Sequence, residues 1–292
     1  MKSYPSWDRQ TRTPSQLPPA GACDSQVHVY GDPARYPPRP GTAYNPPQAT
    51  FDDVLKMHRT LGIERGLIVQ ATCYGTDHRL LVEALARGEG RYRGCAIIDD
   101  SVSDRELLRL HEAGVRGARF NFAKALKISI TPDSFKRSVE RITELGWFAK
   151  IFTLEDEFVA CAPLFEGLRL PVVLDHMGGL DFGKGLGQPG MKIILEFLKK
   201  GNWWVMVSSG DRHSTTGFPW SDAIPFAQAF IGTAPDRIVW GTDWPHVIYA
   251  GKMPNDADLL ELFYRYAPDD ALRRKILVQN PARLFGFESV AA

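Results

Sequence analysis

The sequence has little cysteine, no long apolar run and no excess of charge of one sign. Its 292 residues include four cysteines, none in CxxC spacing, which argues against a disulfide scaffold. No segment approaches the roughly 18 to 20 apolar residues of a membrane-spanning helix, and the first residues do not resemble a signal peptide. The 35 basic and 34 acidic residues are interspersed. We therefore expect a cytoplasmic protein with a small-molecule partner, and neither nucleic acid nor membrane as a partner.

Three common catalytic motifs are also missing. The chain has no nucleophile elbow, no P-loop and no glycine-rich dinucleotide fingerprint. Phosphoryl transfer and hydride transfer therefore have no support, and we expect no cofactor.

The pattern along the chain predicts a (β/α)8 barrel. Residues 1–21 are polar and proline-rich, which predicts an N-terminal arm, and residues 22–292 alternate short apolar runs with segments of helical period. The predicted strands are 23–30, 66–71, 92–98, 114–120, 146–152, 170–176, 203–209 and 237–243. The predicted helices are 51–61, 77–87, 103–112, 132–145, 155–166, 190–200, 221–232, 256–267 and 270–285. Thr50, Thr131-Pro132 and Asp269 supply helix-start signals. A doubly wound open sheet is the alternative.

Polar side chains gather where the predicted strands end, which is where a barrel of this type has its active site. The candidates are Gln26, His28, Thr72, Arg119, Asn121, Lys150, His176 and Asp243. The loop after the first strand adds Tyr44, and Arg212 follows the seventh strand. For Arg212 a solvated loop is an equally good interpretation.

Asp243 is the strongest catalytic candidate, because it closes an apolar strand at the mouth of a dry interior. Such a place is expected to raise the pKa of the carboxyl towards use as a general base. The alternative is a turn residue before Trp244-Pro245. His176 and His28 also close strands, although a lone histidine is often a hydrogen-bonded core residue.

Two cations are candidates for substrate binding. Arg119 ends an apolar strand, and its guanidinium suits a carboxylate or lactone oxygen, with a buried ion pair as the alternative. Lys150 lies among apolar residues and has the same alternative, a structural pair with a neighbouring carboxylate. Asn121, Thr72, Gln26, Tyr44 and Arg212 complete the predicted binding set.

The pair Gln26-x-His28 stands where a metal-binding strand would have His-x-His. The period of two along a strand would aim both side chains at one point. An amide oxygen is a poor zinc ligand beside an imidazole, so we expect no metal.

Five motifs together resemble the amidohydrolase superfamily, and within it a lactonase-like branch. They are DSQVHVY (24–30), QATCYGTD (70–77), GVRGARFN (114–121), LDHMGG (174–179) and WGTDWPH (240–246). The resemblance covers about residues 22–286 and implies a distorted barrel whose site acts on lactones of small polar acids. It implies catalytic roles for His176 and Asp243, a substrate-binding role for Arg119, and a match at Thr72. Gln26 departs from the pattern, as does Lys150, which stands where many metal-dependent relatives have histidine.

The resemblance implies a metal-independent lactone isomerase that interconverts D-galactaro-1,5-lactone and D-galactaro-1,4-lactone by intramolecular acyl transfer, in galactarate and hexuronate catabolism. Asp243 would deprotonate the attacking hydroxyl, His176 or His28 would stabilise the oxyanion or move the proton, and Arg119 would bind the distal carboxylate. Three alternatives stay open: a hydrolase for a small polycarboxylate lactone such as 2-pyrone-4,6-dicarboxylate, a metal-dependent hydrolase or decarboxylase, and a barrel that binds lactones without catalysis.

Overall fold

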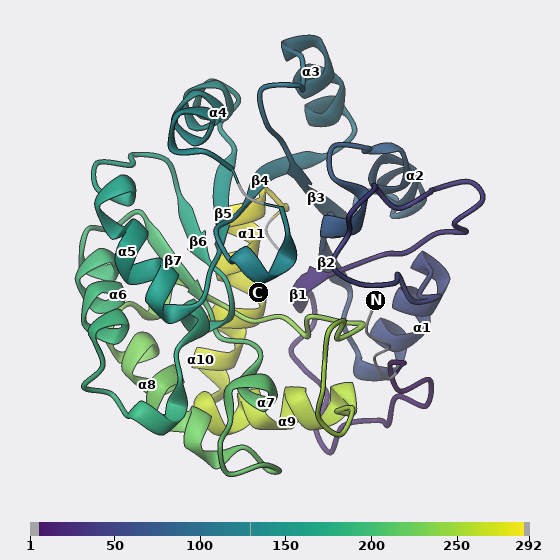
Figure 1. Ribbon diagram of the computed structural model, residues 1–292. Helices are drawn as coiled ribbons and strands as arrows, with labels where there is room; N and C mark the ends of the chain where they lie inside the picture. Colours follow the sequence, from purple (N-terminus) through teal and green to yellow (C-terminus); the bar gives the residue numbers. More distant parts are fainter. Residues whose placement is uncertain (1–5, 129, 289–292) are drawn as a thin grey trace.

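Eight parallel strands form a nearly closed (β/α)8 barrel in a computed structural model that describes residues 6–128 and 130–288 (Figure 1). The strands pair in chain order, which confirms the barrel and rules out the doubly wound sheet. They are β1 (Cys23–Val27), β2 (Arg65–Val69), β3 (Tyr92–Ile97), β4 (Val115–Asn121), β5 (Phe148–Phe152), β6 (Val172–Leu174), β7 (Trp203–Met206) and β8 (Ile238–Val239). Several are shorter than predicted, because the chain turns away to place polar side chains at the mouth.

Helices surround the strands as an outer layer (Figure 1). They are α1 (Phe51–Leu61), α2 (Arg79–Arg87), α3 (Asp104–Glu112), α4 (Pro132–Glu144), α5 (Glu155–Phe165), α6 (Pro189–Lys199), α7 (Gly210–His213), α8 (Ile224–Thr233), α9 (Asp256–Tyr266), α10 (Asp270–Arg274) and α11 (Asn280–Phe285). The predicted helix 270–285 is broken by a π-type turn at 275–279. The short helix α7 lies in a segment for which no helix was predicted.

The helix starts follow the predicted chemistry. Thr50 and Asp53 form a reciprocal capping box at α1. The Thr131 hydroxyl accepts from the backbone of Ser134, and the Asp269 carboxylate accepts from that of Leu272. These side chains satisfy amide groups that have no partner within the helix.

Two apolar layers make up the core. The larger lies between the strands and the helices. The smaller fills the barrel and includes Cys23, Leu67, Cys95 and Phe148, closed by Phe285 of α11. The ring centroids of Phe285 and Phe148 are 5.3 Å apart. Because α11 lies behind the strands in Figure 1, the open end of the barrel faces the viewer.

The barrel closes between β8 and β1 through single contacts rather than a regular ladder. Ser25 donates its backbone N–H to the carbonyl of Trp240, and His28 donates to that of Trp244. Asp24 is fully buried in this junction and accepts from the backbone N–H and the hydroxyl of Thr242, at 3.0 and 2.6 Å. A Cβ on Gly241 would lie 2.7 Å from the backbone nitrogen of Gln26, so the close approach requires glycine.

Residues 6–21 lie along α9 and reach the β8–β1 junction. Arg12 pairs with Asp258 and Glu261 of α9 at 2.7 and 2.9 Å. Trp7 packs edge-on against Trp244, with ring centroids 4.8 Å apart. The segment therefore contacts the residue that follows Asp243. None of the helices in the described part of the chain has the length and apolar character needed to cross a bilayer.

Candidate active site

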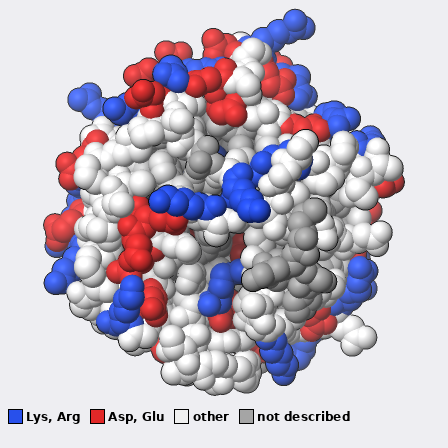
Figure 2. All heavy atoms as spheres, viewed as in Figure 1, with Lys and Arg blue, Asp and Glu red and all other residues white. Residues whose placement is uncertain are grey.

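A cavity of about 190 Å³ opens at the carboxyl ends of the strands. Its polar lining consists of Tyr30 and seven predicted residues: His28, Tyr44, Thr72, Arg119, His176, Arg212 and Asp243. Apolar side chains make up much of the rest, including Phe152, Leu126, Val247 and Ile248. The fold thus brings residues from β4 and from the ends of β1, β6 and β8 to one place. Basic side chains lie near the centre of the face seen in Figure 2, and charges of both signs alternate around its rim.

Asp243 is held in an unusual backbone conformation. Its φ is 64°, in the left-handed region that a residue with a Cβ rarely adopts. Its backbone N–H donates to the carbonyl of Gln26, and the next residue, Trp244, donates to the Thr242 hydroxyl. His176 has a φ of 50°. Strain of this kind is found at functional sites, where the surrounding contacts hold it in place.

The side chain of Gln26 lies between Asp243 and His176. Its Nε2 donates to Asp243 Oδ1 at 2.8 Å and lies 3.2 Å from His176 Nε2. The carboxylate fixes this orientation, because a flipped amide would place oxygen against oxygen. Gln26 does not line the cavity, and its Oε1 has no partner among the described residues. The amide therefore positions the two catalytic candidates from behind.

His176 is a neutral imidazole near pH 7. Burial lowers the pKa of His176 to about 4. Its Nδ1 lies 2.8 Å from the hydroxyl of Ser208 and 2.9 Å from that of Ser209. With Gln26 donating to Nε2, the proton belongs on Nδ1. The lone pair of Nε2 therefore accepts from the Gln26 amide, and Asp243 Oδ1 lies 3.6 Å from the same nitrogen.

Both ring nitrogens of His28 face oxygen atoms. Nδ1 lies 2.7 Å from the carbonyl of Val69, so it donates there. Nε2 lies 3.4 Å from Asp243 Oδ1. The backbone of β2 thus orients the ring towards the carboxylate.

Asp243 is ionised. Burial by itself raises the pKa of this carboxyl, but the imidazoles of His176 and His28 and the guanidinium of Arg212 outweigh it and hold the pKa well below its usual range. Because His176 is neutral near pH 7, we hold Arg212 to be the main cation, with its NH2 group 3.5 Å from Asp243 Oδ2. The sequence-based expectation of a raised pKa was wrong. It accounted for the dry interior but not for the cation that α7 supplies.

A second charged group lies beneath the cavity. Lys150 and Asp175 form a fully buried ion pair, with Nζ 2.6 Å from Oδ1. Arg119 Nε lies 3.9 Å from the other oxygen of Asp175. Two cations therefore share one carboxylate. The surplus positive charge is at Arg119, which lines the cavity.

Hydroxyl groups line the side of the cavity near β2. Tyr30 and Tyr44 hydroxyls are 3.0 Å apart, and the Thr72 hydroxyl donates to Tyr44 at 3.5 Å. Burial raises the pKa of Tyr44, which keeps the phenol protonated. This side of the cavity can both donate and accept hydrogen bonds.

The residues do not fit a divalent metal. Among residues 6–128 and 130–288 there is no group of three or more histidine, cysteine, aspartate or glutamate side chains placed to hold one. Where a ligand would stand, Gln26 turns its N–H rather than its oxygen towards Asp243 and His176. An N–H donor cannot ligate a cation.

Besides Gln26, two predicted site residues lie outside the cavity lining. Lys150 is fully buried and Asn121 lines a neighbouring cavity, so neither borders the 190 Å³ cavity. Their substrate-binding roles stay predictions. Asp175 was expected among the polar residues at the strand ends, whereas Asp24 and Tyr30 were not predicted to belong to the site. Asp24 lies two positions before Gln26, as Gln26 does before His28. This period of two along a strand was the sequence pattern that could have placed Asp24 with them.

Comparisons with known proteins identify the family of this chain. The Amidohydrolase family model matches residues 23–287. The chain is 37% identical over 294 residues to the 2-pyrone-4,6-dicarboxylate hydrolase of Comamonas testosteroni, covering 97% of this chain and 96% of that protein. It is 37% identical over 271 residues to the 4-sulfomuconolactone hydrolase of Rhizobium radiobacter, covering 92% and 91%.

Lower similarity extends to an isomerase and to a solved structure. The chain is 29% identical over 283 residues to the D-galactarolactone isomerase of Agrobacterium fabrum, covering 96% of each protein. A crystal structure of an Agrobacterium tumefaciens protein without ligand superposes with a TM-score of 0.86 at 29% identity, covering 95% of this chain and 100% of that one. A barrel with this site and a family match over nearly its whole length makes the chain a member of the amidohydrolase family.

Proposed function

We propose that this protein hydrolyses a small lactone that carries an acidic group. The observation that supports this most is the convergence of an ionised carboxylate, Asp243, with His28, His176 and two guanidinium groups on one small cavity. These are the groups that acyl transfer to water requires: a base, a proton carrier and donors for an oxyanion.

The substrate class follows from charge and from the cavity wall. Arg119 and Arg212 both line the cavity, and the carboxylate nearest to Arg119, Asp175 at 3.9 Å, is already paired with Lys150 at 2.6 Å. An anionic substituent is therefore favoured. The apolar side chains of Phe152, Val247 and Ile248 suit a flat ring with few hydroxyl groups. The two relatives at 37% identity, named as hydrolases of a pyrone dicarboxylate and a sulfomuconolactone, agree with this choice.

The reaction needs one water molecule and returns every proton. Asp243 takes a proton from water as the water oxygen bonds to the lactone carbonyl carbon. Arg119 or Arg212 stabilises the resulting oxyanion. The intermediate then breaks the ring C–O bond, and the leaving oxygen regains a proton from Asp243 directly or through His28. When the substrate's acidic group pairs with Arg212, the guanidinium stabilises the Asp243 carboxylate less. The pKa of Asp243 then rises towards that of a useful base.

No step in this scheme uses a metal. The donor set around Asp243 does not fit one, and the nucleophile is activated by a carboxylate. We therefore propose metal-independent catalysis, as was predicted from the Gln26-x-His28 pair.

Isomerisation of a sugar-acid lactone, the function first expected from the sequence, is the second candidate. The observation that favours it is the hydroxyl group formed by Tyr30, Tyr44 and Thr72, which could bind the hydroxyls of a polyol acid. Asp243 would then deprotonate a hydroxyl of the substrate instead of water. The isomerase relative at 29% identity is the further support.

One assay separates the candidates. The purified protein is incubated with 2-pyrone-4,6-dicarboxylate, 4-sulfomuconolactone and D-galactaro-1,5-lactone, with and without chelator, and products are followed by NMR. We expect a ring-opened acid from one of the first two, unaffected by chelator. A 1,4-lactone appearing first from the third would establish the isomerase.

The variant Asp243→Asn tests the base. We expect kcat to fall by about a thousandfold or more with the fold retained. The control Asp133→Asn, at an exposed position on α4, should leave kcat unchanged. If kcat of Asp243→Asn stayed within tenfold of the parent, Asp243 would not be the base. If the parent bound the three lactones without turning any of them over, the protein would be a non-catalytic barrel.

A further inference from the structure

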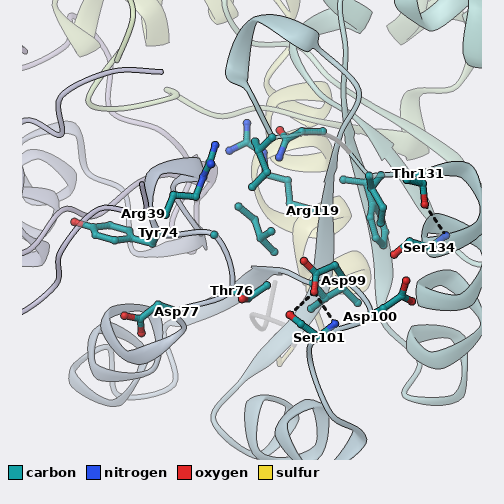
Figure 3. A pocket seen from close by; sticks show the side chains of 17 residues that line it. Arg39, Tyr74, Thr76, Asp77, Asp99, Asp100, Ser101, Arg119, Thr131 and Ser134 are labelled. Atoms are coloured by element: carbon teal, nitrogen blue, oxygen red, sulfur yellow. Dashed lines mark hydrogen bonds between the residues drawn. The ribbon is translucent and has the colours of Figure 1, made fainter. Parts of the chain in front are cut away.

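A second and larger cavity lies beside the candidate active site. It has a volume of about 700 Å³ and is lined by residues 74–77, 97–101 and 119–121, together with Arg39, Thr131 and Ser134 among others. We call it the side cavity (Figure 3). Arg119 borders both cavities. The active-site cavity of about 190 Å³ is smaller than the roughly 300–1,000 Å³ typical of ligand sites, whereas the side cavity falls within that range.

Two side chains of β4, Arg119 and Asn121, line the side cavity, and each carries a buried polar atom without a hydrogen-bond partner in the described part of the chain. Arg119 is 5% exposed and Asn121 is 4% exposed. Among the described residues, Arg119 Nε and Asn121 Oδ1 have no hydrogen-bond partner. A buried polar group without a hydrogen-bond partner is unfavourable. An anion on Arg119 and a donor on Asn121 would remove that cost.

The charges around the side cavity agree with an anion at its Arg119 end. Arg39 directs its guanidinium to the carbonyls of Thr72 and Lys127, at 3.1 and 2.8 Å, and pairs with no carboxylate among the described residues. In Figure 3, Arg39 and Arg119 lie on one side of the cavity, and Asp99, Asp100 and Ser101 lie together on the other. Asp100 is neutralised by Arg137 at 2.6 Å, and Asp77 by Arg79 at 2.7 Å. Asp99 accepts from the backbone N–H and hydroxyl of Ser101 and has no ion pair among the described residues, so an anion fits the end of the cavity formed by Arg39 and Arg119.

We propose that the side cavity is a binding site for a hydroxy acid, with its carboxylate on Arg119 and its hydroxyl donating to Asn121 Oδ1. Residues 119 and 121 are two apart on a strand, so their side chains leave the same face and can hold two groups of one molecule. A hydroxy acid is also the class of compound that opening a lactone produces. That link to the reaction rests on the proposed function, whereas the binding site itself does not.

Because Arg119 borders both cavities, occupancy of one affects the other. A carboxylate held in the side cavity would draw the guanidinium away from the active-site cavity. We therefore expect a hydroxy acid to weaken substrate binding without entering the reaction.

The experiment compares two probes that differ by one hydroxyl. Citrate and tricarballylate carry the same three carboxylates, and only citrate has the hydroxyl. Isothermal titration of the full chain should show citrate binding about tenfold more tightly, the upper range for one neutral hydrogen bond. In Asn121→Leu, a change of similar volume, the two probes should bind within about twofold of each other.

Two controls locate the effect. Arg212→Gln alters only the active-site cavity of the two and should keep the citrate preference, as should Asp243→Asn. Three outcomes would refute the side-cavity proposal. The parent chain could bind the two probes equally, it could bind neither measurably, or the preference for citrate could survive Asn121→Leu but be lost in Arg212→Gln. If the protein hydrolyses a lactone but does not prefer citrate over tricarballylate, only the side-cavity proposal is refuted. If it prefers citrate but turns over no lactone, only the proposed function is refuted.

Discussion

The side-chain amide of Gln26 donates to Asp243 Oδ1 at 2.8 Å, and the backbone N–H of Asp243 donates in return to the carbonyl of Gln26 at 3.1 Å. The first and last strands therefore hold each other at the residue expected to act as base. A histidine at position 26 would present a ring where the structure has an amide donor.

Gln26→Glu removes this donor and adds a charge. Because the position is fully buried, we expect the second carboxylate to raise the pKa of Asp243 or to be protonated itself. Unfolding free energy should fall by about 3–5 kcal/mol and kcat by at least tenfold at pH 7, measured by urea unfolding and the lactone assay. Gln228→Glu, on the exposed face of α8, is the charge-matched control. Unchanged stability in Gln26→Glu would contradict the arrangement.

Thr242→Val tests how the β8–β1 junction positions Asp243. The variant loses the 2.6 Å hydrogen bond to the buried Asp24 carboxylate. Bonds to charged groups are worth about 1.5–3 kcal/mol, so we expect a loss of about 2 kcal/mol and a lower kcat with KM little changed. A double-mutant cycle with Asp24→Asn should give a coupling energy of about 0.5–3 kcal/mol. Thr13→Val is the exposed control, and strict additivity would argue against the coupling.

Acid should destabilise the protein through His176. Its pKa is about 4 when folded and about 6.5 when unfolded, so between these values the unfolded chain binds the extra proton. Stability is therefore lost as pH falls from 6.5 to 4, by up to about 3 kcal/mol. Asp243, whose pKa is depressed, contributes only below its unfolded value near 3.8. We expect Tm to fall as the pH is lowered from 6.5 to 4, and we expect Tm to depend less steeply on pH in His176→Asn. An equal slope in the variant would count against a buried neutral imidazole.

Lys150→Met separates a structural role for this lysine from substrate binding. Removing the ammonium leaves Asp175 buried with Arg119 as its nearest cation, which should cost about 3–5 kcal/mol. Arg119 is then drawn towards Asp175, so KM for an acidic lactone should rise. Adding Asp175→Asn should restore part of the stability. Lys192→Met, exposed on α6, serves as control. A rise in KM without any loss of stability would favour direct substrate contact.

The sequence predicted the barrel and most of the lining, because both depend on local pattern. Apolar runs located every strand, and polar residues at their ends located His28, Thr72, Arg119, His176 and Asp243. The pKa of Asp243 could not be predicted in this way, since it depends on Arg212, which lies on α7. The pairing of Lys150 with Asp175 was only one of two open interpretations, because strand register between β5 and β6 decides it.

The β8–β1 junction joins residues more than 200 positions apart, since Thr242 contacts Asp24 across 218 residues. Contacts of such long range form late in folding, because a large loop must close before they are made. Asp243 and Gln26 can meet only when the two ends of the barrel have come together. A chain still emerging from the ribosome would therefore have no assembled site, and regain of activity after dilution from denaturant would report the last step of barrel closure.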